Sequence, residues 1–287
     1  MDHFGIADAN IKPFFGMNKY FEQIFSKKSH INTYICTFHF MLIKNYLDAT
    51  YLKLPEQAGL NADENDQVVF AFIKEAITFD FKAVMIRPQY VAVAKKMIEE
   101  AHSKVQIGTV IGFHEGTMST EEKLLEAEQA ITDGADDLDF VCNFQAFQTG
   151  QIDLVKREVL AGTHLALSHH KVIKWIIEVA ALNPLQIVQL SALIKNVFFA
   201  NFNETLCHQV FVKSSTGFYQ TTNNKPNGAT TDSIKLMLEN AYPLPVKAAG
   251  GVRNYHEAMA MINLGVKRIG TSAAKDIVLG LENHQAY

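Results

Sequence analysis

The chain has 287 residues, of which 48% are hydrophobic and 20% are charged, a composition typical of a soluble globular protein with one large domain or two small ones. The formal net charge of −4 gives no electrostatic reason to expect nucleic acid or an anionic membrane as a partner. The three cysteines are widely spaced and match no zinc motif, so we expect reduced thiols in a cytoplasmic protein and no bound metal.

The first forty residues do not share the pattern of the rest of the chain. They are rich in Phe and mixed in polarity, and their most apolar stretch, residues 31–43, is too short to span a bilayer and is interrupted by polar residues. We therefore predict an N-terminal extension, residues 1–40, and one domain, residues 41–287. The extension could be an added helix, an arm that packs on a partner, or a translated upstream stretch.

From about Asn45 onward, short apolar runs alternate with amphipathic stretches such as TEEKLLEAEQAITDG, which has helical spacing. The runs are apolar at consecutive positions, as parallel strands buried on both faces require. The eight predicted strands lie within residues 45–50, 83–86, 105–113, 137–142, 172–178, 209–213, 244–250 and 266–272.

Eight strands with intervening helices in roughly 240 residues predict an α/β fold, the closed (β/α)8 TIM barrel. The alternative is a doubly wound open sheet. The chain has neither a G-x-G-x-x-G after its first strand nor a Walker loop, so the common nucleotide sites of that alternative are missing.

Two lysines end neighbouring strands of this barrel, Lys213 in FVKSSTGF and Lys247 in PVKAAGGVR. Active sites of such barrels form at the carboxyl ends of the strands. Two ammonium groups about 4 Å apart repel by roughly 4 kcal/mol at an effective dielectric of ~20, which would lower one pKa by about three units. We therefore expect a substantial fraction of one lysine to be the neutral amine, the form that attacks a carbonyl. Alternatively, each lysine reaches solvent separately.

Carboxylates and a third lysine end other strands at the same edge. Asp139 lies near the end of the fourth strand, where it could relay protons during imine formation or only neutralise the lysines. Asp136 and Asp137 come earlier and are expected to be solvated or capping. Asp48 and Lys174 complete the polar residues at the strand ends.

Glycine-containing loops follow the last three strands: STGF (215–218), AGGVR (249–253) and IGTSAA (269–274). Glycine lets backbone N–H groups approach an anion closely, and the loops after strands seven and eight are the usual phosphate site of such barrels. Arg253 could clamp a phosphate or pair structurally.

The histidines are weaker candidates: we interpret His114 as a loop residue, and His256 and the pair His169-His170 as parts of no metal motif. Trp175 should pack against a helix.

Together, FVKSSTGF, VKAAGGVR, RIGTSAA, GADDLDFV, TVIGFHEGTMSTEEKLLEAEQAI and WIIE resemble the deoxyribose-phosphate aldolases, class I aldolases with a (β/α)8 barrel. The resemblance runs from about Asn45 to Ala274. It implies reversible cleavage of 2-deoxy-D-ribose 5-phosphate to D-glyceraldehyde 3-phosphate and acetaldehyde in deoxyribonucleotide catabolism, with no metal or other cofactor. It implies that Lys213 forms the Schiff base, that Lys247 perturbs it and that Asp139 relays protons. The substrate-binding positions that it implies are Asp48, Lys174, Gly217, Gly250, Gly251, Arg253, Gly270 and Ser272.

The chain departs from the family pattern at several positions. Phe218 stands where some members carry a lysine, so one phosphate contact is expected to be missing. Met85 stands where several members carry a cysteine, which predicts better tolerance of reactive aldehydes, and Arg87 follows where smaller or neutral residues are common. The terminal Tyr287 resembles that of some relatives whose tail reaches the site; the alternative is an exposed, frayed chain end.

Two other functions fit the pattern less well. Another Schiff-base barrel, such as a transaldolase-like or keto-acid aldolase, would take a different substrate. A catalytically silent barrel could bind a sugar phosphate or a partner, with the N-terminal segment as the contact surface. A homodimer is compatible with such a barrel, but no residue predicts one.

Overall fold

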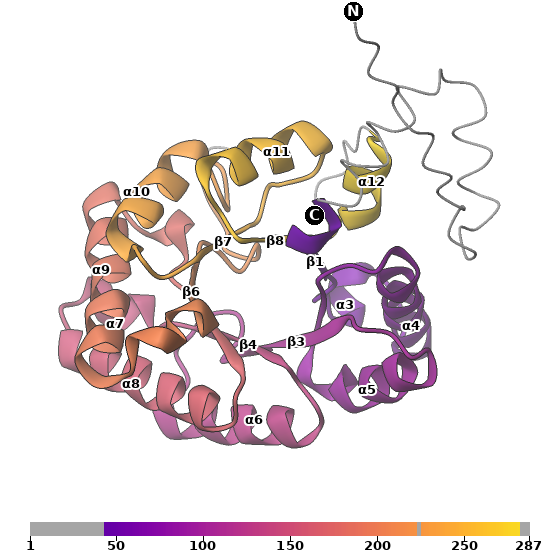
Figure 1. Cartoon of the computed structure of the whole chain (residues 1–287), viewed down its shortest axis with the longest axis horizontal. Helices are drawn as coiled ribbons and strands as arrows, with labels where there is room; N and C mark the ends of the chain where they lie inside the picture. The colour runs from indigo at the N-terminus through magenta and orange to yellow at the C-terminus, as the bar shows by residue number, and fades with distance from the viewer. Residues whose placement is uncertain (1–42, 223–224, 282–287) are drawn as a thin grey trace, which may run out of the picture. The chain divides into compact units, whose positions relative to one another are not determined.

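The structure is a computed structural model that describes residues 43–222 and 225–281. Eight parallel strands close into a barrel in chain order (Figure 1), which confirms the predicted (β/α)8 architecture and excludes the open sheet. The division of the chain near residue 41, the extension before it and Tyr287 lie outside the described residues and stay predictions. The strands are β1 (Leu47–Thr50), β2 (Ala83–Ile86), β3 (Gln106–Ile111), β4 (Asp137–Val141), β5 (Val172–Ile176), β6 (Val210–Lys213), β7 (Val246–Ala249) and β8 (Arg268–Thr271).

Helices lie around the barrel, as Figure 1 shows. Each of the eight observed strands lies within the range predicted for it from the sequence. In the described part of the chain, no helix has both the length and the apolar character needed to cross a bilayer. The helices are α3 (Pro55–Ala58), α4 (Ala62–Phe79), α5 (Val91–Glu100), α6 (Thr120–Thr132), α7 (Phe144–Gln148), α8 (Ile152–Ser168), α9 (Pro184–Asn201), α10 (Thr231–Ala241), α11 (Tyr255–Leu264) and α12 (Ala274–Leu279).

Three of the long helices begin with a capping box, in which two side chains satisfy backbone N–H groups that the first turn leaves without partners. At the start of α4, the Asn61 side chain accepts from the N–H of Glu64, and the Glu64 carboxylate accepts from the N–H of Asn61, both at 2.9 Å. α6 and α9 begin in the same way, with Ser119 and Asn183 at the N-cap.

The layer between the barrel and its helices is apolar. Trp175 of β5 is fully buried there, with its ring 5.1 Å from that of Phe140, and its Nε1 donates to Thr163 Oγ1 of α8 at 3.0 Å. A Cβ atom at Gly162 of α8 would lie 2.8 Å from the Trp175 ring, so the helix can approach the strand only with glycine at that position. The predicted packing of Trp175 against a helix is confirmed.

The barrel interior is polar at its centre. In most barrels of this type, layers of branched apolar side chains fill the interior. Here the strand register places Lys174 beside Asp139 on the next strand, and Lys247 beside Lys213. The inward-facing charges therefore come together inside the barrel rather than diverging into solvent.

Candidate active site

Asp139 is the centre of a cluster of seven charged side chains inside the barrel, none of them more than 4% exposed. Its Oδ1 accepts a hydrogen bond from Lys174 at 2.9 Å, and its Oδ2 accepts from both Lys213 and Lys247 at 2.8 Å. Because the latter two share one oxygen atom, their Nζ atoms are separated by no more than twice that distance. The predicted meeting of Lys213 and Lys247 is confirmed.

The other contacts close a ring in which acids and bases alternate. Asp48 forms ion pairs with Lys247 and with Nε of Arg268, both at 2.6 Å. Oδ2 of Asp137 accepts from Nη2 of Arg268 and from Lys174, both at 2.7 Å. We call this set the ion-pair ring; its members, in order, are Asp139, Lys247, Asp48, Arg268, Asp137 and Lys174.

Lys213 is the surplus cation of the cluster. The ion-pair ring contains three carboxylates and three cations, and Lys213 joins it only through Asp139, which already binds two other lysines. Burial is the main reason that the pKa of Lys213 falls to about 8, and the charges of Lys247 and Lys174 lower it further against the attraction of Asp139. The sequence-based expectation assigned this effect to repulsion between the two lysines. That assignment was wrong, because loss of solvation on burial lowers the pKa of Lys213 more than the charge of Lys247 does.

The carboxylates of Asp139 and Asp48 stay ionised. Burial alone would raise the pKa of Asp139, but Lys174, Lys213 and Lys247 together hold it well below its usual value. Burial also opposes ionisation of Asp48, yet the neighbouring cations, Arg268 foremost, lower its pKa to about 2. At neutral pH these groups act as fixed negative charges and hydrogen-bond acceptors.

Two members of the ion-pair ring were missed or misplaced from the sequence. Asp137 was expected to be solvated or capping, and this was wrong, because its side chain is fully buried between Arg268 and Lys174. Asp136 is half-buried, and its carboxylate accepts from the N–H of Ile107 at 2.9 Å. The only signal for Arg268 was its parity with Gly270 on the last strand, which points both residues inward.

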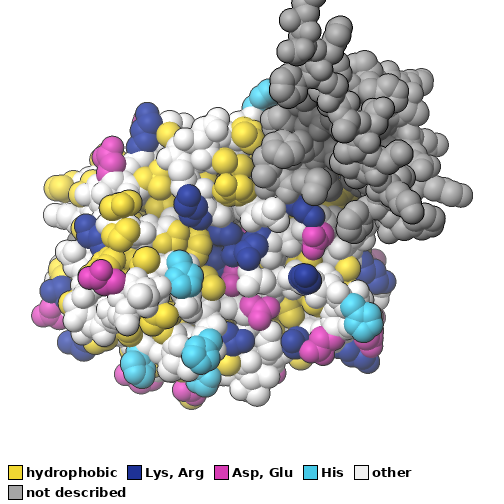
Figure 2. Space-filling view, in the orientation of Figure 1, with side chains coloured by type: hydrophobic (Ala, Val, Ile, Leu, Met, Phe, Trp, Pro, Cys, Tyr) yellow, Lys and Arg dark blue, Asp and Glu magenta, His cyan; other side chains and the backbone are white. Residues whose placement is uncertain are grey.

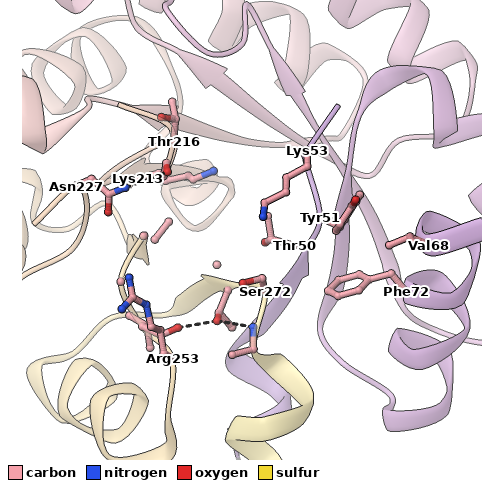
Figure 3. Close-up of a pocket in the computed structure, with 18 residues that line it drawn as sticks. Thr50, Tyr51, Lys53, Val68, Phe72, Lys213, Thr216, Asn227, Arg253 and Ser272 are labelled. Atoms are coloured by element: carbon pink, nitrogen blue, oxygen red, sulfur yellow. Dashed lines mark hydrogen bonds between the residues drawn. The ribbon is translucent and has the colours of Figure 1, made fainter. Parts of the chain in front are cut away.

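A cavity of about 340 Å³ lies at the carboxyl ends of the strands, next to the cluster, and Lys213 forms part of its wall (Figure 3). Asp48 and Lys174 do not line it. They were expected to bind substrate, and the structure instead places them, fully buried, in the ion-pair ring. Six residues predicted for the phosphate pocket do line the cavity: Gly217, Gly250, Gly251, Arg253, Gly270 and Ser272.

The glycine loop after β7 has the geometry of an anion site. Gly250 and Gly251 adopt positive φ angles of 76° and 86°, which side-chain-bearing residues rarely adopt. Within residues 43–222 and 225–281, no atom accepts a hydrogen bond from the N–H of Gly217, Gly250, Gly251 or Ser272. Ala229 helps to fix this loop, because its N–H donates to the Gly250 carbonyl at 2.9 Å. These four N–H groups are therefore available to a ligand.

The loops after β7 and β8 are tied together. Thr271 Oγ1 donates to the carbonyl of Val252 at 2.6 Å and accepts from the N–H of Ala273 at 3.0 Å, as the dashed lines in Figure 3 show. The backbone N–H of Arg253 donates to the Glu257 carboxylate at 2.6 Å, which fixes the loop that carries the Arg253 side chain. Among the described residues, no carboxylate forms an ion pair with the Arg253 guanidinium.

Glu178, which follows β5 by two residues, was not predicted as part of the site. It is only 1% exposed, and its Oε2 accepts from the N–H of Thr216 at 3.1 Å and from Thr216 Oγ1 at 2.5 Å. Burial raises the pKa of Glu178 to about 7. Because Thr216 and Gly217 line the cavity in the loop that follows Lys213, Glu178 fixes the loop beside the nucleophile candidate.

Phe113, His114 and Phe218 do not line the cavity, whose wall includes the aromatic residues Tyr51 and Phe72. The Phe218 ring packs edge-on against Phe113 at 5.0 Å and lies 5.9 Å from His114, which is a half-buried loop residue as expected. Arg87 lies 4.7 Å over the Phe113 ring. Met85 is fully buried, and its sulfur occupies the space that a side chain at Gly108 would need. His169, His170 and His256 are exposed, away from the cluster.

Comparison with known sequences identifies relatives over most of the chain. The family model described as DeoC/LacD family aldolase matches residues 54–285. A deoxyribose-phosphate aldolase of Thermococcus gammatolerans is 36% identical over 244 residues, which cover 85% of this chain and 98% of the relative. Deoxyribose-phosphate aldolase 1 of Staphylococcus aureus is 36% identical over 248 residues, or 86% of this chain and 100% of the relative.

Solved structures show the same fold. The aldolase QR15 matches with a TM-score of 0.67 and 28% identity over 83% of this chain and 95% of its own. The deoxyribose phosphate aldolase of Aeropyrum pernix, whose structure is described as a unique tetramer, matches with a TM-score of 0.67 and 27% identity, covering 83% of this chain and 89% of its own.

Proposed function

The chain belongs to the DeoC/LacD family of aldolases, and from this premise we propose that it cleaves 2-deoxy-D-ribose 5-phosphate reversibly to D-glyceraldehyde 3-phosphate and acetaldehyde through a Schiff base on Lys213. The observation that carries the proposal is the position of Lys213. The cluster has one more cation than carboxylates, and Lys213 is the cation that lies outside the ion-pair ring. It also lines the cavity. The aldolase relatives named above support the sugar phosphate as substrate.

The nucleophile is the neutral amine of Lys213. With its pKa lowered to about 8, about one molecule in ten carries the neutral amine at pH 7, compared with fewer than about one in a thousand for an ordinary lysine. In the cleavage direction Nζ adds to the aldehyde carbon of the open-chain sugar, and the adduct loses water to give a protonated imine. No metal ion or other cofactor is needed, because this iminium is the electron sink.

Carbon–carbon cleavage then follows from electron flow into the iminium. The hydroxyl on the third carbon loses its proton, the bond between the second and third carbons breaks, and its electron pair forms an enamine on Lys213. D-Glyceraldehyde 3-phosphate leaves with the new carbonyl. The enamine takes up a proton at the second carbon, and water then hydrolyses the resulting imine to acetaldehyde and the free amine.

Asp139 and Lys247 assist the proton transfers in this scheme. Oδ2 of Asp139 accepts hydrogen bonds from Lys213 and Lys247 at the same 2.8 Å, so a proton can pass between the two amines along that oxygen or through a neighbouring water. Because Asp139 stays ionised, we assign it to orienting both amines and relaying protons rather than to holding a proton for long.

The phosphate binds in the glycine loops at the other end of the cavity. The N–H groups of Gly250, Gly251 and Ser272 and the guanidinium of Arg253 supply the donors, which favours the clamp over the structural role for Arg253. Binding of this remote group places the reacting carbon over Lys213, so that binding energy is used for orientation.

The free thiols of Cys142 and Cys207 support a cytoplasmic location for the enzyme.

Trapping with acetaldehyde and borohydride tests the proposal. Reduction should add a two-carbon unit to the wild-type chain, visible by intact mass, and peptide mapping should place it on Lys213. Lys213→Ala should lose the adduct, whereas Lys96→Ala, which removes a lysine exposed on α5, should keep it. An adduct on another lysine would reassign the nucleophile, and an adduct with a keto acid but not with acetaldehyde would indicate a different aldolase.

A further inference from the structure

Lys53 lines the cavity, and the mechanism above gives it no role. It follows β1, in the segment that leads into α3, and its side chain is half-buried. In Figure 3 the Lys53 side chain enters the cavity from the β1 side with its ammonium group beside Thr50, whereas Arg253 enters from the β7 side. The two cations therefore come from different walls of one cavity.

Barrel closure puts the Lys53 loop next to the glycine loops. β8 pairs with β7 on one side and with β1 on the other, so the loop after β8, which carries Ser272, lies between those that carry Arg253 and Lys53. The approach of β1 and β8 is close: a Cβ atom at Gly270 would lie 3.7 Å from Thr50 Oγ1. An anion bound at Ser272 would therefore lie between the loops that carry the two cations.

The charges of the cavity wall match a phosphate dianion. Among the described residues that line the cavity, the charged side chains are Lys53, Lys213 and Arg253, and none is a carboxylate. Lys213 must be neutral to react, so Lys53 and Arg253 remain as two positive charges. A phosphate monoester carries about 1.5 to 2 negative charges at pH 7, because its second pKa is about 6. On the basis of the function proposed above, we infer that Lys53 is a second phosphate-binding cation, opposite Arg253.

Neighbouring elements hold the Lys53 loop in place. Arg87, which follows β2, donates from Nε to the carbonyl of Leu52 at 2.8 Å, directly before Lys53 in the chain. On the other side, the N–H of Leu54 donates to the Gln57 side chain of α3 at 2.9 Å. The backbone on both sides of Lys53 is thereby fixed, so the entropy lost when its ammonium group meets a phosphate is limited to the side chain.

Steady-state kinetics of the full-length chain test the inference, with 2-deoxyribose 5-phosphate and 2-deoxyribose as paired substrates. Lys53→Met removes the charge while retaining the length of the side chain, and Lys53→Arg retains the charge. Lys96→Met is the matched control, because it removes an exposed lysine of α5. We expect Lys53→Met to raise KM for the phosphorylated sugar about tenfold. This is the lower end of the range expected for loss of a hydrogen bond to a charged group, because the site is partly exposed. Its kcat/KM for 2-deoxyribose should stay within about twofold of wild type.

Lys53→Arg should restore most of the affinity, and the inhibition constant for inorganic phosphate should rise in Lys53→Met but not in Lys96→Met. Equal losses for both sugars would overturn the inference, as would an unchanged KM for the phosphorylated sugar. Acetaldehyde trapping on Lys213 serves as a separate readout. If wild type neither traps acetaldehyde nor cleaves the sugar phosphate, the proposed function fails; if wild type does both and Lys53→Met binds phosphate normally, only the role of Lys53 fails.

Discussion

Replacing Lys247 with Leu should raise the pKa of Lys213 and move imine formation to higher pH. Lys247 lies 2.8 Å from the same Asp139 oxygen as Lys213, and its positive charge lowers the pKa of Lys213. The substitution removes that repulsion. It also leaves Asp139 with one lysine fewer to bind, which strengthens its attraction for the Lys213 ammonium group.

The size of the effect follows from the separation of the two amines. Two unit charges roughly 5 Å apart interact by about 3 kcal/mol at an effective dielectric of about 20, which corresponds to about two pKa units. The pKa of Lys213 should therefore rise from about 8 to about 10, because burial, the larger cause of the shift, remains. At pH 7 the neutral fraction falls about a hundredfold, whereas near pH 10 it falls only about twofold.

The assay is the initial rate of acetaldehyde trapping by borohydride as a function of pH, with far-UV circular dichroism to confirm folding. Wild type should show an inflection near pH 8, and Lys247→Leu should lose about a hundredfold at pH 7 and recover as the pH approaches 10. Lys174→Leu is the matched comparison, because Lys174 binds the other oxygen of Asp139 and should shift the inflection less. An unchanged inflection, or a loss of equal size at every pH, would refute the electrostatic role of Lys247.

Three further substitutions test the supporting structure. Arg268→Met leaves two buried carboxylates of the ion-pair ring short of a partner and should lower the free energy of unfolding by roughly 3–5 kcal/mol in urea titrations; a loss below about 1 kcal/mol would show that the ring relaxes easily. Because the folded-state pKa of Glu178 is raised from 4.5 to about 7, the folded chain binds more protons than the unfolded chain in this window, and stability falls as pH rises through it. Glu178→Gln should therefore stabilise the protein by up to roughly 3 kcal/mol at pH 8 and hardly at all at pH 4.5, and equal effects at both pH values would contradict the assignment. Gly228→Ala should weaken binding of inorganic phosphate while sparing acetaldehyde trapping, because a methyl group there would overlap the Gly250 backbone; unaltered phosphate inhibition would show that the loop shifts without consequence.

The barrel and the proximity of Lys213 to Lys247 could be predicted from the sequence, because both follow from the spacing of the strands along the chain. Runs that are apolar on both faces identify parallel strands, and a polar residue at the end of such a run must lie at the carboxyl edge. The spacing of the two lysines by one strand-helix-strand unit then makes them neighbours. Trp175 was placed correctly for a similar reason, since alternation puts it on the face opposite Lys174.

The closed ion-pair ring could not be predicted in the same way. Asp137 stands at the start of its strand, where an exposed position is the default, and only the register of β4 against β5 brings it to Lys174. Arg268 reaches Asp137 across the barrel, a contact that depends on side-chain length and on closure rather than on local spacing. The dominance of burial over repulsion in lowering the pKa of Lys213 depends on solvent exclusion, which no sequence pattern reports.

Titration of Lys213 itself tests the central claim most directly. With ¹³C-labelled lysine, the ε-carbon resonance that disappears in Lys213→Met can be followed by NMR as the pH is raised. We predict that this carbon titrates near pH 8, well below the ordinary range of a lysine side chain. A Lys213 resonance that stays in its charged form until pH 10 would contradict the claim that a buried surplus of positive charge provides the reactive amine.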